Sequence, residues 1–185
     1  MNEGYTIVFV DESGFSLTPS VVRTWALVGE TPMIHHPYNW EKLSSISAVT
    51  TSDKLYFRLY RGKTIKTPEV VAFLRQLLSR IPGNVLVLWD GLPQHRSLKV
   101  RKFVEKHPRL EIRRLPAYSP DLNPDEWVWN YLKTRELANF CASNTPELKK
   151  EIHVRLRRMQ RRPELIHSFL RASELPWDEE RALPN

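Results

Sequence analysis

The sequence predicts an α/β fold built on one mixed sheet, with antiparallel strands first, parallel strands after them, and helices on its flanks. Two patterns lead to this prediction. Residues 43–62 hold two stretches that alternate apolar and polar side chains around a short turn, which is typical of a β-hairpin. Residues 67–115 alternate helical and strand patterns, which indicates right-handed parallel crossovers. A chain of 185 residues suits one domain with a sizeable core.

The first third of the chain is expected to form antiparallel sheet. Tyr5 to Glu12 is almost continuously apolar, which favours a strand buried on both faces. Residues 21–29 (VVRTWALVG) give a second strand candidate. After a loop that contains Pro37, the strands of the hairpin are expected over residues 43–51 and 54–62.

The middle third carries the helical signals. Thr67 is a capping residue followed by proline, and the helix that it starts should end before Pro82-Gly83. Three further elements are expected: a strand over residues 84–89, a helix over residues 94–106 and a short strand over residues 110–115. Residues 116–124 contain three prolines and should be irregular.

The last third is expected to be helical and basic. Asn123 can cap a helix that begins at Pro124, and the segment from Thr145 onward is helical with many cations. We predict a first domain over residues 1–142 and a basic helical extension over residues 143–185, packed on the same domain.

Composition narrows the class of protein. The net charge of +7 favours a polyanionic partner. Cys141 is the only cysteine, which excludes an intramolecular disulfide and a thiolate metal site. No apolar run approaches the roughly 20 residues that span a bilayer, and no signal peptide is recognisable at the N-terminus. We therefore expect a cytoplasmic protein without a membrane partner.

Three acids lie at positions typical of catalytic or metal-binding residues. Asp11 and Asp90 follow buried strands, and Glu126 lies in the first turn of a helix. Carboxylates are hard ligands for Mg²⁺ or Mn²⁺, and ions in pairs promote phosphoryl transfer. Taken singly, an Asp after a strand is usually a turn former and a Glu in a first turn usually a capping residue. Together they predict a metal site that cuts nucleic-acid phosphodiesters.

Three stretches support this interpretation: VFVDESGF, LWDGLPQH and LPAYSPDLNPDEWVW. They resemble the DDE transposases of the mariner superfamily, in particular its bacterial insertion-sequence branch. In that family a strand-end Asp opens the domain, a second Asp is soon followed by a His, and the third acid follows a Tyr-Ser-Pro-x-Leu-Asn-Pro run. Asp11, Asp90, His95 and Glu126 match that pattern here, and residues 23–32 resemble the stretch between the first two strands. Gly91 departs from it, since the family commonly has Asn there.

The resemblance implies a ribonuclease H-like fold and a transposase catalytic domain. It implies that Asp11, Asp90 and Glu126 are catalytic and hold Mg²⁺ or Mn²⁺, as two ions, with His95 and Asn123 as support. The implied reaction is hydrolysis at the ends of an insertion element, followed by attack of the freed 3′-hydroxyl on target DNA. Two neighbouring acids, Glu12 and Asp125, are left outside the predicted site because their side chains should point elsewhere.

Double-stranded DNA is the implied partner, bound by a homodimer. The basic stretch near the C-terminus should contact its phosphates, through Arg155, Arg157, Arg158, Arg161 and Arg162. A solvated helix face or a dimer contact is the alternative. Mariner-type transposases also carry N-terminal helix-turn-helix modules, so we expect a separate helix-turn-helix polypeptide or an N-terminal half fused by frameshift.

Two other functions stay open at this point. Another ribonuclease H-like nuclease, such as a resolvase or an RNA–DNA hybrid nuclease, would use the same acids on a different substrate. A remnant of a transposase that only binds DNA would keep the basic surface without cleavage.

Overall fold

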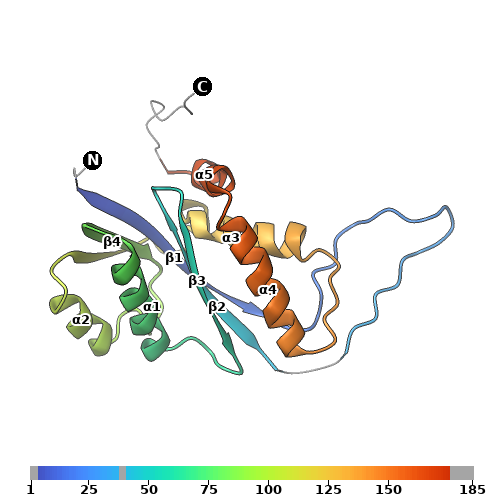
Figure 1. The fold of residues 1–185 in the computed structure, drawn as a ribbon, viewed down its shortest axis with the longest axis horizontal. Coiled ribbons are helices and arrows are strands. Elements are labelled where there is room, and N and C mark those ends of the chain that lie inside the picture. Colours follow the sequence, from blue (N-terminus) through green and yellow to red (C-terminus); the bar gives the residue numbers. More distant parts are fainter. Residues whose placement is uncertain (1–3, 38–40, 176–185) are drawn as a thin grey trace.

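A computed structural model describes residues 4–37 and 41–175, and in it five strands form one mixed sheet flanked by helices (Figure 1). The strands are β1 (Tyr5–Phe15), β2 (Leu43–Thr50), β3 (Leu55–Arg61), β4 (Asn84–Trp89) and β5 (Leu110–Arg114). The helices are α1 (Thr67–Arg80), α2 (Leu98–Glu105), α3 (Pro124–Tyr131), α4 (Thr145–Met159) and α5 (Pro163–Ala172). A 3₁₀ turn (Pro120–Leu122) precedes α3, and a π-helical turn (Leu132–Glu136) follows it.

The strand order is β3-β2-β1-β4-β5. β2 pairs antiparallel with both β1 and β3, whereas β4 pairs parallel with both β1 and β5. The predicted α/β class, antiparallel strands first and parallel strands after, is confirmed. Because β1 and β4 run in the same direction, their carboxyl ends lie at the same edge of the sheet, where ligands of α/β folds usually bind.

Each face of the sheet is covered by its own apolar cluster. Val8 and Val10 of β1 pack with α1 and α2 on one face, whereas Phe9 packs with α3, α4 and α5 on the other. Side chains alternate along a strand, so Asp11 belongs to the face of Phe9 and Glu12 to the face of Val10. The sheet thus separates these two neighbouring acids.

The strand expected over residues 21–29 is wrong. This segment belongs to a long connection between β1 and β2 that extends away from the sheet (Figure 1), and its apolar side chains Trp25, Leu27 and Val28 are exposed. Its base is fixed by Asn139, whose side chain bonds both the N–H and the C=O of Val22. Apolar character suggested a strand here, but the segment has no strand neighbour among the described residues.

Two helix starts also differ from the prediction. α2 begins at Leu98 rather than Gln94 because the Ser97 side chain accepts a hydrogen bond from the Val100 N–H and caps the helix there. Thr67 is the first helical residue of α1 instead of its cap, and Lys66 occupies the capping position.

The C-terminal helices share the main core. Leu148, Ile152 and Leu156 of α4 and Ile166 and Phe169 of α5 belong to the same cluster as Phe9 of β1. The boundary at residues 142 and 143 stays a prediction. None of the described helices is long and apolar enough to cross a bilayer.

Candidate active site

The three predicted acids are brought to one region by three different elements. Asp11 lies in the second half of β1, and Asp90 directly follows β4, its parallel neighbour. Glu126 lies in the first turn of α3, which packs on β1 and β2. Asp11 and Glu126, which are 115 positions apart in the sequence, therefore interact, because the fold places the second half of β1, the end of β4 and the start of α3 beside one another.

Electrostatics shows how strongly the three carboxyl groups influence one another. The pKa of Asp11 is raised from 3.8 to about 7, first by burial and then by the negative charges of Glu126 and Asp90. Glu126 is exposed at the surface, yet partial desolvation raises its pKa; Lys133 opposes the rise, and the charge of Asp90 adds to it. This pattern is expected where like charges share a site that a cation would neutralise.

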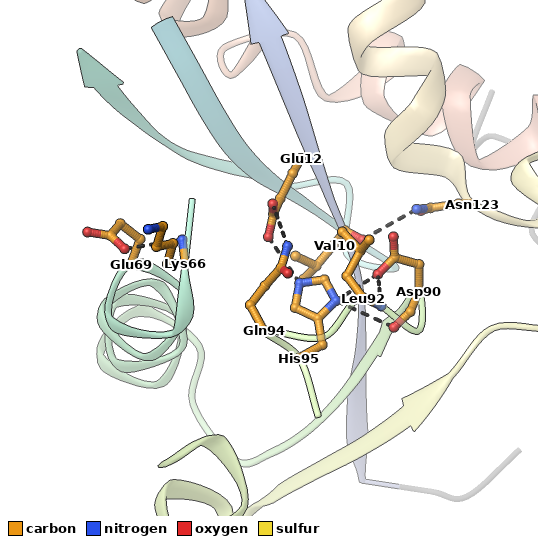
Figure 2. Close-up of polar contacts among 9 residues, drawn as sticks. All are labelled: Val10, Glu12, Lys66, Glu69, Asp90, Leu92, Gln94, His95 and Asn123. Atoms are coloured by element: carbon orange, nitrogen blue, oxygen red, sulfur yellow. Dashed lines mark hydrogen bonds and ion pairs between the residues drawn. The ribbon is translucent and has the colours of Figure 1, made fainter. Parts of the chain in front are cut away.

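The N-terminus of α3 is fastened to the strand that carries Asp11. The Asn123 side chain accepts a hydrogen bond from the Asp125 N–H at 3.2 Å and donates through Nδ2 to the Val10 carbonyl at 3.3 Å (Figure 2). One buried amide thus caps the helix and fixes its first turn beside β1. This is the contact through which Asn123 could support the site.

His95 links the second acid to the opposite face of the sheet. Its Nδ1 lies 2.7 Å from Oδ1 of Asp90, and its Nε2 lies 3.0 Å from Oε1 of Glu12 (Figure 2). Gln94 donates from Nε2 to the other oxygen of Glu12 at 3.2 Å. The His95 ring also stacks on Trp89, with centroids 4.2 Å apart and planes 8° apart. Packing and two carboxylates therefore hold the imidazole in one orientation.

These contacts settle charge states at neutral pH. Burial alone would lower the pKa of His95, but hydrogen bonds to Asp90 and Glu12 raise it to about 9, so the ring is a cation that donates to both. Burial likewise opposes ionisation of Asp90, but hydrogen bonds from His95 and from the Leu92 N–H hold its pKa below the usual value. Asp90 is thus ionised and half-exposed, with its second oxygen, Oδ2, outside these bonds.

Asp125 is a fourth acid beside the site. It is fully buried, and Ser47, which pairs with Asp11 across β1 and β2, donates to its Oδ2 at 2.7 Å. Its Oδ1 has no hydrogen-bond partner among the described residues. Burial and the charge of Asp11 raise the pKa of Asp125 well above its usual range.

Glu12 and Asp125, which were not predicted as metal ligands, both lie beside the site, each for its own reason. Strand alternation does place Glu12 on the face away from Asp11, but His95, which stacks on Trp89 on that same face, connects Glu12 to Asp90 just beyond the end of β4. Asp125 points inward because Pro124 and Asp125 form the buried first turn of α3. The available signal for Asp125 was helical spacing: it lies three and four residues before the apolar Val128 and Trp129, and so on the same face of α3.

The five predicted DNA-contacting arginines divide into two groups. Arg155 and Arg158 both pair with Glu136, at 3.6 and 3.5 Å, and Arg162 pairs with Glu164 at 3.3 Å. Arg157 and Arg161 instead line surface hollows beside β3. DNA contact by these residues stays a prediction, and intramolecular ion pairs already use three of them.

The donor chemistry of the site fits a divalent cation. Carboxylates are hard oxygen ligands of the kind that Mg²⁺ and Mn²⁺ prefer, and here the charges of neighbouring acids oppose the ionisation of Asp11 and Glu126, which a cation would relieve. No group of three or more His, Cys, Asp or Glu side chains within residues 4–37 and 41–175 lies close enough together to hold a metal in this conformation. Charge and donor type therefore fit, whereas a closed ligand set requires side-chain movement.

Comparisons with known proteins agree with this picture. The profile of the family described as DDE superfamily endonuclease matches residues 6–149. An uncharacterized 39 kDa protein of insertion element IS630 from Shigella sonnei is 22% identical over 152 residues, which cover 80% of this chain and 44% of that protein. The chain thus spans less than half the length of this relative.

Solved structures with the same fold come from the Mos1 transposase. The catalytic domain of Mos1 mariner transposase has a TM-score of 0.57 at 18% identity, over 93% of this chain and 84% of that one. The Mos1 mariner paired-end complex with Mn has a TM-score of 0.63 at 21% identity, over 93% and 56% of the two chains. The expected ribonuclease H-like fold is confirmed by these likenesses.

Proposed function

The chain belongs to the DDE superfamily endonucleases, and from this membership we propose that it is the catalytic part of a transposase of the mariner and insertion-sequence type. In this proposal it cleaves DNA at the ends of an insertion element and joins the freed 3′-hydroxyl to target DNA. The observation that supports the proposal is that Asp11 of β1, Asp90 after β4 and Glu126 of α3 lie near enough for the charges of Glu126 and Asp90 to raise the pKa of Asp11.

Divalent cations belong to the same proposal. Mos1 paired-end complexes have been solved with Mn and with Mg. In this chain Asp11, Asp90 and Glu126 would hold Mg²⁺ or Mn²⁺, and we propose two ions. Two bound metal ions would activate the attacking oxygen and stabilise the leaving oxygen of phosphoryl transfer. Because Glu126 is exposed, its side chain is the one that we expect to move when metal binds.

The protein's own residues contribute positioning and charge. Asp90 is kept ionised and oriented by His95, and Glu12 and Trp89 hold His95 in place. Asn123 keeps the first turn of α3, and with it Glu126, beside β1. Such positioning supplies much of the rate of phosphoryl transfer, since no covalent protein nucleophile is needed.

The remaining expectations about partners and location are proposals of the same kind. Double-stranded DNA would be both substrate and target, bound by a homodimer. A helix-turn-helix polypeptide, separate or fused by frameshift, would recognise the element ends. We place the protein in the bacterial cytoplasm, at the nucleoid when it is bound to DNA.

A cleavage assay tests the proposal. Purified protein is incubated with inverted-repeat DNA, four-way junctions and RNA–DNA hybrids in Mg²⁺ or Mn²⁺. We expect cleavage of the inverted-repeat DNA, and we expect Asp90→Asn to abolish it while DNA binding persists. Preference for junctions or hybrids would indicate a resolvase or a hybrid nuclease. DNA binding without cleavage of any of these substrates would indicate a transposase remnant that only binds DNA.

A further inference from the structure

A basic groove runs along the outer edge of β3, where α4 and α1 flank the strand. It has a volume of about 620 Å³, and a second hollow of about 300 Å³ continues it and shares Arg157 and Gln160. The first hollow is lined by the cationic or titratable side chains Arg58, Arg61, Lys149, Lys150, His153 and Arg157. The second adds Lys54 and Arg161. Neither hollow is lined by an Asp or a Glu.

Most of this charge is not neutralised inside the protein. Arg61 pairs with Glu41 at 2.6 Å, but Arg58 and Arg157 bond only to the neutral amides of Gln76 and Gln160. Over the described ranges of the chain, Lys149, Lys150 and Arg161 form no ion pair with an acid. The groove therefore differs from the neighbouring helix face, where Glu136 and Glu151 neutralise Arg155.

The edge strand adds hydrogen-bond donors to this surface. The Thr50 N–H donates to the Lys54 carbonyl, and the Gly62 N–H donates to the Lys42 carbonyl. Because antiparallel pairs alternate, every second residue of β3 between these two positions turns its N–H and C=O groups toward β2. The residues between them, Phe57 and Leu59, turn their N–H and C=O groups toward the groove. Backbone N–H groups together with Lys and Arg are common contacts to phosphate oxygens in protein–DNA complexes.

We propose that the basic groove binds the sugar-phosphate backbone of DNA outside the position of cleavage; this inference rests on the proposed function. From Lys149 to Arg157, α4 rises about 12 Å, which is the length of three to four phosphates at about 3.4 Å per step of one strand. An acidic peptide added to the edge of β3 would also meet positive charge, but the cations continue past the strand edge to Arg161 and along the exposed side of α4.

The groove is distinct from the candidate active site. Phe57 is in register with Ser47, and Ser47 with Asp11, so the two sites are level along the strands but two strands apart. At the usual spacing this separates their backbones by about 10 Å. None of the three carboxylates lines the groove. Binding in the groove can thus be removed without touching the residues proposed for cleavage.

The test compares DNA binding of three proteins in EDTA, over a range of salt concentrations. The groove variant carries Lys149→Ala, Lys150→Ala and Arg157→Ala. The control carries Lys99→Ala, Arg101→Ala and Lys102→Ala, three exposed cations of α2 on the other face of the sheet. A charge-preserving variant, Lys149→Arg with Lys150→Arg, shows whether the groove region still folds and binds.

We expect the groove variant to lose on the order of 10–100-fold in affinity near 0.1 M salt and about 2–3 in the slope of log K against log salt. The control and the charge-preserving variant should bind as the native chain does. Equal losses in the groove variant and the control would overturn the proposal, as would a groove variant that binds DNA normally but no longer binds a poly-glutamate peptide.

Cleavage in Mg²⁺ is measured separately, so that the two proposals fail in different ways. A chain that binds DNA through the groove but cleaves no substrate would contradict the proposed function and leave the groove inference standing. If the native chain cleaves inverted-repeat DNA and the groove variant binds and cleaves equally well, the proposed function stands and the groove inference is contradicted.

Discussion

Nδ1 of His95 lies 2.7 Å from Oδ1 of Asp90, and the same ring reaches Glu12 through Nε2 at 3.0 Å. A buried imidazolium thus joins a half-exposed carboxylate on one side to a nearly buried one on the other. We infer that Glu12 positions Asp90 through His95, in the way that outer partners orient the ligands of metal sites.

Removal of the Glu12 carboxylate tests this positioning role. Glu12→Ala would leave His95 Nε2 without its acceptor, so we expect metal-dependent cleavage to fall by about 10–100-fold. DNA binding in EDTA should not change. Glu12→Gln keeps an oxygen acceptor and should recover most of the activity. Native cleavage by Glu12→Ala would show that the contact does not position Asp90.

Asp11 should make the metal-free protein less stable as pH rises. Its pKa is about 7 in the folded state against 3.8 in the unfolded chain, so the folded state binds more protons between these values. The free energy of unfolding should therefore fall as pH rises from about 4 to 7. Asp11→Asn should remove this loss, on the order of 2–4 kcal/mol at pH 8.

Urea unfolding in EDTA at pH 5 and pH 8 measures the effect. The native chain should lose stability between the two, and Asp11→Asn should lose distinctly less. Equal losses would contradict a desolvated Asp11 in the folded state. His95 acts in a higher window: its contribution is complete below pH 6.5 and is lost as pH rises through about 9.

How far the sequence could predict this site depends on the residue. Asp90 follows a strand and Glu126 begins a helix, and these are local patterns that a sequence displays, whereas Asp11 lies inside β1, which continues to Phe15 instead of ending at Glu12 as expected. The role of Glu12 depends on its contact with His95, which lies 83 positions later in the chain. No local pattern contains that contact.

The fold shows the same division. The hairpin and the buried β4 have strong periodicity, and their strands were predicted within a few residues. The segment of residues 21–29 has strand-like composition, yet Trp25 is 98% exposed because no neighbouring strand is available to it among the described residues. The composition of a segment indicates its tendency to form a strand, but a strand forms only where the fold brings another strand beside it.

Asp125 and Glu126 are adjacent acids for which we predict opposite outcomes. Asp125 is buried, its pKa is raised by that burial, and it accepts a hydrogen bond from Ser47. Asparagine keeps that acceptor, so Asp125→Asn should change stability by less than about 1 kcal/mol and preserve cleavage. Glu126→Gln removes a proposed metal ligand and should abolish cleavage without loss of stability. Thermal melting and cleavage of both variants are measured side by side. Lost cleavage in Asp125→Asn with native cleavage in Glu126→Gln would contradict the prediction.

A crystal structure of the chain soaked in Mn²⁺, with the ion located by its anomalous scattering, tests the central claim most directly. We expect manganese bonded to carboxylate oxygens of Asp11 and Asp90, with the Glu126 side chain turned toward the ion. Manganese at another group of residues, with these three carboxylates left without metal at saturating concentration, would contradict it.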